Sequence, residues 1–205
     1  MRKIYDDKQK VVRNQFNCNG AYDMPILYES PIELDHIAMI SFDHLTRKRN
    51  NANKIVHFFQ EDHTFLRVYE LPEKQLSKIA SCYAAITPDF SLYADMPRAL
   101  QINSVFQSRW CGAYWQDNGI RVIPSVSWST PDSFEFCFDG LPNEAIVVVS
   151  TIGCKKVRKE FMCGYDAMLE RIKPRTIICC GETFPEMRGN ILAFGYLEIT
   201  GRRSA

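Results

Sequence analysis

Short apolar runs rich in Val and Ile, separated by segments with helical spacing, constrain the fold of this chain more than any other feature. The clearest pair is AIVVVS (145–150) and TIICC (176–180), and the helix expected between them carries Phe161, Tyr165 and Met168 on one face. Continuous apolar runs are typical of strands covered on both faces, and alternating strands and helices indicate a parallel sheet. The sequence therefore predicts an α/β fold.

The same pattern extends along most of the chain. We expect strands at residues 35–42, 53–59, 65–70, 83–87, 121–127, 145–150, 176–180 and 191–199. We expect helices at 72–81, from Met96 and Pro97 to Asn118, at 131–138 and at 155–172. Up to eight strands favour a (β/α) barrel-like fold, complete, degenerate or incomplete. The chain length is near the lower limit of about 200 residues for that fold. The gap between the second and third strands is too short for a helix, so an open doubly wound parallel sheet is the rival architecture.

Composition bounds the domain organisation and the classes of partner. With 46% hydrophobic residues the chain can bury a full core, and we expect one α/β domain at 31–200, an irregular N-terminal arm at 1–30 and a polar tail at 201–205. The formal net charge is +1, so no global field favours nucleic acid or an anionic membrane. Nucleic acid is an unlikely partner, since only the basic runs at 47–50 and 155–159 point to it.

Neither the first residues nor the cysteines indicate export. The start, MRKIYDDKQKVV, is too charged for a signal peptide, and no run approaches the roughly 20 apolar residues of a membrane span. Eight cysteines occur without a CxxC motif, and the four histidines do not alternate with them at zinc-finger spacing. We therefore expect a cytoplasmic protein with free thiols and no structural zinc. No dinucleotide or phosphate-loop motif identifies a cofactor.

Polar residues recur where the predicted strands end, which is the edge at which ligands bind in either architecture. The candidate acid, base or metal-ligating residues there are Asp43, Asp89 and Glu182. Convergent carboxylates can bind a divalent metal or share acid and base roles, although each one could instead cap a loop or pair with Lys or Arg. Candidate ligand-binding residues at the same edge are Ser91, Ser127, Trp128, Ser129, Ser150 and Thr151.

Two segments at this edge are ambiguous. In STIGCKKVRK (150–159), Gly153, Lys155 and Lys156 could present a phosphate site at a helix N-terminus, or the lysines could solvate a surface helix. In SWSTPD (127–132), Thr130 and the residues after it are typical of a helix start, which leaves Ser127 to Ser129 unexplained. Trp128 could contact a ligand or only cover the end of the barrel.

Several long motifs resemble a known family. They are TPDFSLYADMPRALQ (87–101), RWCGAYWQ (109–116), VIPSVSWS…FCFDG (122–140) and VVVSTIGC (147–154). From about Asn17 to Asn190 the chain resembles a domain of unknown function found in uncharacterised proteins of phages, prophages and other mobile elements. The resemblance implies a bacterial cytoplasm and offers no reaction or catalytic residue. RWCGAYWQ is expected in the second half of a helix, away from the strand ends. We therefore assign the motif mainly to packing, with Arg109 and Gln116 satisfying polar groups.

These observations predict a pocket at the strand ends for a small phosphate-bearing ligand such as a nucleotide. If the protein is an enzyme, the three carboxylates would be metal ligands or the acid and base. The alternative is a non-enzymatic protein that sequesters a host signal nucleotide or inhibits a host protein. The sequence determines neither the metal nor the oligomeric state.

Overall fold

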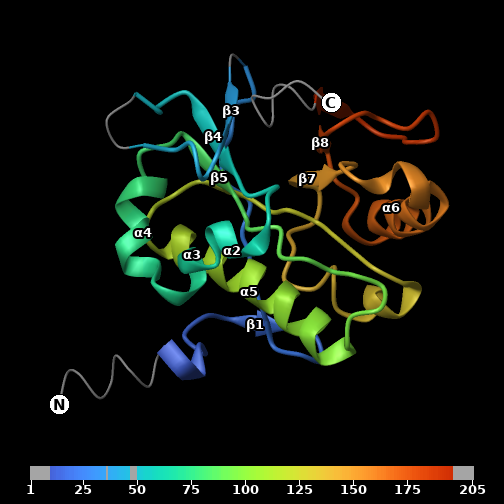
Figure 1. The fold of residues 1–205 in the computed structure, drawn as a ribbon, viewed down its shortest axis with the longest axis horizontal. Helices are drawn as coiled ribbons and strands as arrows, with labels where there is room; N and C mark the ends of the chain where they lie inside the picture. Colours follow the sequence, from blue (N-terminus) through green and yellow to red (C-terminus); the bar gives the residue numbers. More distant parts are fainter. Residues whose placement is uncertain (1–9, 36, 47–49, 196–205) are drawn as a thin grey trace.

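The computed structural model describes residues 10–35, 37–46 and 50–195, and within them it has two parallel sheets (Figure 1). The first has the order β3 (Ala38–Ser41), β4 (Lys54–His57), β5 (Ala84–Ile86) and β6 (Val122–Ile123). The second has the order β7 (Ile146–Ser150), β8 (Thr176–Cys180) and β9 (Ile191–Phe194). A single parallel bridge between Ser125 and Val148 joins them. The predicted α/β class with parallel strands is confirmed.

The helices lie against these sheets in two groups. The α-helices are α2 (Asp62–Phe65), α3 (Arg67–Glu70), α4 (Pro72–Ile79), α5 (Arg98–Asp117) and α6 (Arg158–Ile172), and the 3₁₀ helices are η1 (Pro131–Glu135) and η2 (Cys154–Val157). Side chains from α2 to α5 pack with one face of β4 to β6, and α6 packs with β7 and β8 (Figure 1).

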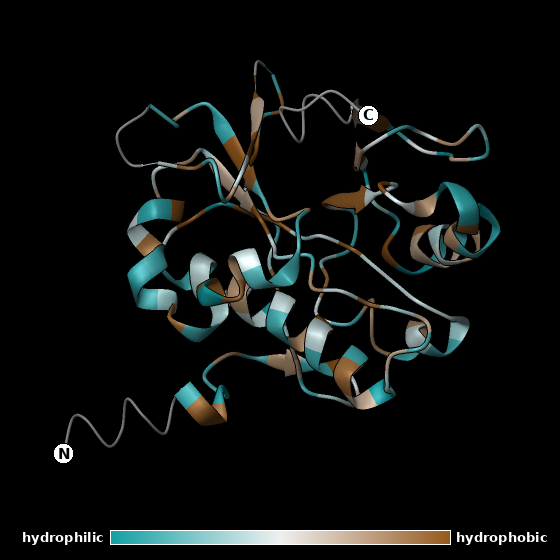
Figure 2. Ribbon diagram, in the orientation of Figure 1, coloured by the Kyte–Doolittle hydropathy of each residue, from teal (hydrophilic) through white to brown (hydrophobic). Residues whose placement is uncertain are grey.

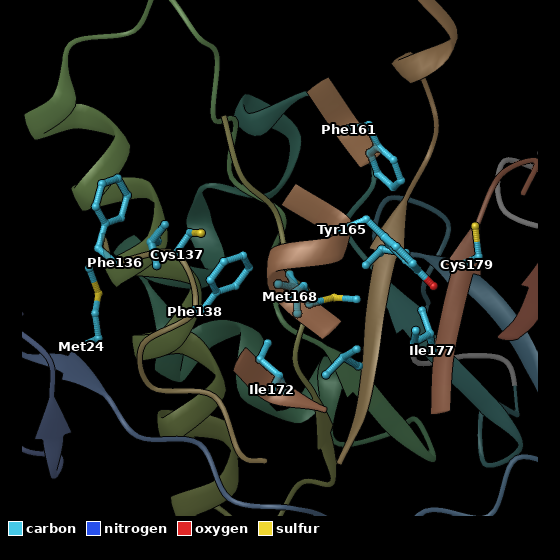
Figure 3. Packing of buried hydrophobic residues seen from close by; sticks show 14 of the residues in the cluster. Met24, Phe136, Cys137, Phe138, Phe161, Tyr165, Met168, Ile172, Ile177 and Cys179 are labelled. Carbon is cyan, nitrogen blue, oxygen red and sulfur yellow. The ribbon is translucent and has the colours of Figure 1, made fainter. Parts of the chain in front are cut away.

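Alternate residues of each strand enter different hydrophobic clusters. On β8, Ile177 and Cys179 face α6, whereas Ile178 and Cys180 join an inner cluster that also holds Ile55 of β4. Figure 3 shows Tyr165 and Met168 of α6 filling the space beside Ile177 and Cys179. Both faces of the strands are therefore covered, as the continuous apolar runs predicted, and Figure 2 shows hydrophilic residues on the outer turns of α4 and α6.

The strand order bears on the two expected architectures. All pairings described are parallel and follow the chain order, apart from a short antiparallel pair formed by β1 (Cys18–Asn19) and β2 (Met24–Pro25) in the N-terminal arm. A doubly wound sheet requires a reversal of strand order, and the described strands show none. No pairing between β9 and β3 occurs among the described residues, so barrel closure is not found.

One predicted strand is wrong. Residues 65–70 form the end of α2 and the whole of α3, and with α4 they build the connection between β4 and β5. The physical reason is the three-residue spacing of Phe65 and Val68, which are both fully buried and lie on the same side of successive helical turns. The segment after the short gap is helical, so the gap does not separate two strands and is no evidence against a barrel.

Further expectations change in detail or lie outside the described residues. The helix expected at 155–172 begins as α6 only at Arg158, after the separate 3₁₀ turn η2, and the helix expected at 131–138 is the 3₁₀ helix η1. Residues 1–9, 47–49, the end of the strand expected at 191–199 and the tail at 201–205 fall outside the described part of the chain. Across the part described, no helix is both long enough and apolar enough to span a membrane.

A buried guanidinium connects α5 to the chain between the two sheets. Arg109 is 2% exposed and donates to three backbone carbonyls: from Nη1 to Ser125 (3.2 Å), from Nη2 to Cys137 (2.7 Å) and from Nε to Asp139 (3.1 Å). Burial lowers the pKa of Arg109 to about 10, with the nearby Asp139 and Asp89 acting in the opposite direction. Arg109 therefore satisfies buried carbonyls, and Gln116 bonds both backbone groups of the exposed Tyr28, so both side chains satisfy polar groups, as expected.

Replacing Arg109 tests how much this network contributes. Arg109→Leu leaves three carbonyls without a donor, each at a cost of about 1–3 kcal/mol, so we expect the free energy of unfolding to fall by at least about 3 kcal/mol. Urea denaturation measures the change. Arg121→Leu is the control because Arg121 is exposed, with its guanidinium over the ring of Tyr83. A loss below about 1 kcal/mol in the Arg109 variant would contradict the prediction.

Candidate functional site

A cavity of about 800 Å³ lies where the strands β3 to β7 end. Loops that follow parallel strands meet at one edge of a sheet, so residues far apart in the chain come together there. Among the described residues that line it, the polar and titratable ones are Ser41, Asp43, His44, His57, Gln60, Glu61, Thr64, Asp89, Ser91, Tyr93, Ser127, Ser150 and Cys154. Its aromatic lining comes from Phe59, Phe90, Tyr93, Trp128 and Phe161. None of the described lining residues is Lys or Arg.

The structure brings together most, though not all, of the residues singled out from the sequence. The cavity is lined by Asp43, Asp89, Ser91, Ser127, Trp128, Ser150 and Gly153. The residues that lie outside its lining are Glu182, Ser129, Thr151, Lys155 and Lys156. No group of three or more His, Cys, Asp or Glu side chains suited to a metal ion occurs among the described residues.

Asp43 follows β3 and lies at the exposed rim of the cavity. Its Oδ1 accepts hydrogen bonds from the Ser41 hydroxyl, the Gln60 amide and, at 2.9 Å, the His44 backbone N–H. Partial burial raises the pKa of Asp43, but these hydrogen bonds and the nearby His44 outweigh it, so the net pKa is lowered. The Nε2 atom of His44 lies 3.6 Å from Asp43 Oδ2. Asp43 is thus a charged carboxylate held in a fixed orientation.

Asp89 follows β5 and is more deeply placed. Its Oδ1 accepts a hydrogen bond of 3.0 Å from Ser125 Oγ. Burial raises the pKa of Asp89 to about 6 and the charge of Asp62 acts in the same direction, whereas hydrogen bonds from Ser125 and Ser127 and the charge of Arg109 lower it. The two carboxyl groups of one cavity therefore differ in protonation below about pH 6, where Asp89 holds a proton and Asp43 does not.

Ser91 and Ser150 line the cavity with their hydroxyls already engaged. Asp62 accepts hydrogen bonds from both the backbone N–H and the hydroxyl of Ser91, the latter at 3.0 Å, and so fixes the loop after β5. Ser150 Oγ donates to the Cys180 carbonyl at 3.4 Å and accepts from the Ile152 N–H. The hydrogen bonds of these two serines therefore hold the loops around the cavity, and their side chains line it.

Trp128 forms a wall between the cavity and α6. Its indole lies 5.2 Å from the ring of Phe161 and 6.3 Å from that of Phe138, measured between centroids. It also lies over Gly164 of α6, where a Cβ atom would overlap the indole. Trp128 therefore both covers the core and faces the cavity, so the two roles considered from the sequence are not alternatives.

Ser129 has a structural setting instead. Its hydroxyl donates to the Gln101 side chain of α5, and its backbone N–H donates to Ser133 Oγ at 3.1 Å. Thr130, the expected helix cap, makes no side-chain capping bond. The Ser133 hydroxyl instead connects this turn, because it donates to the Thr130 carbonyl and accepts from the Ser129 N–H. The serine at 129 thus orients the start of η1.

The expected phosphate turn is arranged differently from the prediction. Lys155 and Lys156 lie on the exposed turn η2, so they are not in the first turn of α6. Lys155 Nζ forms a salt bridge of 2.8 Å with Glu182, and both side chains are more than 70% exposed. Thr151 is buried and donates to the Glu182 carbonyl at 2.8 Å. Glu182 and Lys155 therefore neutralise each other outside the cavity.

Sequence reasoning missed part of the lining. His57 is the last residue of β4, is 1% exposed, and stacks on Phe59 with 5.6 Å between ring centroids. Gln60 bridges Asp43 and Thr64, since its amide donates to the former and its carbonyl accepts from the latter. The sequence does contain an indication of these residues, because HFFQ (57–60) spans the end of β4 as Ser41 to Asp43 span the end of β3.

Comparison with known proteins identifies the family. Residues 16–197 match the family described as Domain of unknown function (DUF4417). The chain belongs to this family. The resemblance inferred from the long motifs is confirmed. All the residues that line the cavity fall within the matched region.

Relatives within the family come from phages. The chain is 38% identical over 173 residues to the Gene 1 protein of Mycobacterium phage D29, covering 83% of this chain and 64% of that protein. It is also 38% identical over 177 residues to the Gene 1 protein of Mycobacterium phage L5, covering 83% of this chain and 76% of that protein. The chain thus spans less than two thirds of the D29 relative. No solved structure matches the chain.

The raised pKa of Asp89 predicts a pH-dependent stability. An aspartate ionises near pH 4 in an unfolded chain, whereas Asp89 in the folded protein ionises near pH 6. As the pH rises from 4 to about 6, the unfolded state loses its proton first, so the free energy of unfolding falls. Asp89→Asn abolishes this contribution. Between pH 4 and pH 7 the variant should gain on the order of 2 kcal/mol relative to the native chain in urea unfolding. The exposed Asp117→Asn is the control, and parallel stability curves for Asp89→Asn and the native chain would contradict the prediction.

Gly164 provides a second test. Alanine in place of glycine within a helix normally stabilises by about 1 kcal/mol. Here the new methyl group overlaps the Trp128 indole, so we expect Gly164→Ala to lower the free energy of unfolding by about 1–3 kcal/mol and to shift the tryptophan emission. Cys163→Ala, at the neighbouring exposed position of α6, should change neither quantity. A stabilised Gly164→Ala variant would show that the indole does not rest on α6.

Proposed function

We propose that the cavity at the strand ends binds a small organic molecule with a planar ring and several hydrogen-bond donors, a nucleoside or a nucleotide. The observation that carries the proposal is that Asp43 and Asp89 line one cavity together with five aromatic side chains. Its volume of about 800 Å³ lies within the 300–1,000 Å³ typical of small-molecule sites. The sequential parallel strands beneath it support an open, barrel-like scaffold.

The chemistry of the lining favours donors on the ligand. Carboxylates accept hydrogen bonds, and amino and hydroxyl groups on a base and a ribose supply them. Trp128 and Tyr93 offer ring faces and edges for a planar base. Because the described lining residues include no Lys or Arg, a phosphate group fits poorly between the two aspartates. A phosphate on the ligand would instead lie at the outer edge, near Gly153 and the exposed lysines of η2.

Isothermal titration calorimetry with a panel of nucleosides and their 5′-monophosphates tests the proposal. Loss of one hydrogen bond to a charged group costs about 1.5–3 kcal/mol, so Asp43→Asn and Asp89→Asn should each weaken binding about 10- to 100-fold. Asp117→Asn should bind like the native chain. Absence of binding by every member of the panel would overturn the proposal.

The double variant Lys155→Ala/Lys156→Ala locates the phosphate. If the phosphate lies at the outer edge, this variant should weaken binding of the monophosphates alone and leave the nucleosides unaffected. A variant that binds the monophosphates as tightly as the native chain does would exclude the lysines from the site and retain the aspartate part of the proposal. Ligand recovered unchanged after denaturation would favour a sequestering protein.

A further inference from the structure

The two aspartates of the cavity sit in opposite environments built by different elements. Asp43, after β3, receives three hydrogen-bond donors on one oxygen, two of them from the neighbouring residues Ser41 and His44. Asp89, after β5, is bonded only by serine hydroxyls and forms no salt bridge in the described part of the chain. Carboxyl groups whose surroundings separate their protonation states are the usual basis of acid and base assignments.

The other charged and titratable groups around Asp89 either make hydrogen bonds to other residues or remain uncharged. Asp62 of α2 holds Ser91, and Arg109 of α5 bonds three carbonyls. The thiols of Cys154 on η2 and Cys180 on β8 also face Asp89, and burial raises the pKa of both, so they remain protonated. Asp89 can therefore exchange a proton with a bound molecule near pH 6.

The charges of the cavity also select a class of reaction. Hydrolysis of an ester or a phosphate builds negative charge, which enzymes stabilise with cationic groups or hydrogen-bond donors. Here the acidic groups of the described lining are Asp43, Glu61 and Asp89 when ionised, and its basic groups are His44 and His57, with no Lys or Arg. Such a lining stabilises positive charge. Cleavage of a glycosidic bond through an oxocarbenium-like transition state develops positive charge on the sugar.

We infer that the cavity is an active site for hydrolysis of the glycosidic bond of a nucleoside or a related glycoside, with Asp89 as the proton donor and Asp43 as the stabilising carboxylate. This inference rests on the proposed function, since it takes the same ligand class in the same cavity. Asp89 donates its proton to the leaving-group atom as the bond from that atom to the anomeric carbon breaks. The bonding electron pair leaves with the base or aglycone.

The remaining steps add one water molecule to the sugar and return both carboxyl groups to their starting protonation states. The positive charge left on the sugar faces the Asp43 carboxylate, and a water molecule adds to the anomeric carbon and gives its proton to Asp43. Exchange with solvent then removes that proton and reprotonates Asp89. The products are the free sugar and the protonated leaving group, with water as the only co-reactant.

The experiment compares two leaving groups with the full chain. Nucleosides, whose base needs a proton to leave, and a 4-nitrophenyl riboside, whose phenolate leaves without one, are incubated with the protein, and release of base, nitrophenolate and reducing sugar is measured. We expect Asp89→Asn to lower kcat for nucleosides at least about 100-fold, in addition to the weaker binding expected above, and to lower kcat for the nitrophenyl riboside far less. Asp43→Asn should slow both, and Asp117→Asn neither. Activity on nucleosides should fall above pH 6.

Each outcome decides between the two proposals. Binding of nucleosides without release of sugar overturns hydrolysis and leaves the binding function standing. Neither binding nor release overturns both. An equal loss for both leaving groups in Asp89→Asn excludes Asp89 as the proton donor, provided that circular dichroism shows the variant folded. Asp89→Glu, which restores a carboxyl group, should recover part of the activity on nucleosides, and failure to do so in a folded variant also counts against the assignment.

Discussion

The guanidinium of Arg109 is the interaction on which the arrangement of both sheets depends. β6 has only two residues and is joined to β7 by a single bridge at Ser125, so backbone pairing contributes little at this point. Arg109 compensates by holding the carbonyls of Ser125, Cys137 and Asp139 from α5. A buried cation is costly unless its donors are satisfied, and here all three partners come from the segment that links the sheets. The long helix thus fixes the position of one sheet relative to the other.

Ser125 transmits this constraint to the cavity. Its carbonyl accepts from Arg109, its backbone N–H donates to Thr87 Oγ1 at 2.8 Å, and its hydroxyl donates to Asp89. The carboxyl group in the cavity is therefore oriented by the same residue that joins the sheets. The RWCGAYWQ motif, which the sequence assigned to packing, acts on the candidate site through this contact, although it lines no part of the cavity.

The sequence predicted the strands and long helices because β-branched runs and helical spacing report burial directly. It failed at residues 65–70, because a short run of apolar residues is compatible with both a strand and a helix until a neighbouring core selects one. The strand-end rule found Asp43, Asp89 and Trp128 in the cavity. It also selected Glu182 and Lys155, whose mutual salt bridge depends on a tertiary approach that spacing does not encode. His57 and Gln60 were missed because an apolar run concealed a polar strand end.

Gly164 influences the size of the cavity without lining it. The indole of Trp128 can lie on α6 only because position 164 lacks a side chain, so any larger residue there would displace the wall while the lining sequence stayed the same. Within a phage family, selection could therefore resize the cavity from a helix that contributes only Phe161 to it. Divergence in the size of this cavity between relatives would then appear at α6 before it appears among the polar residues of the lining.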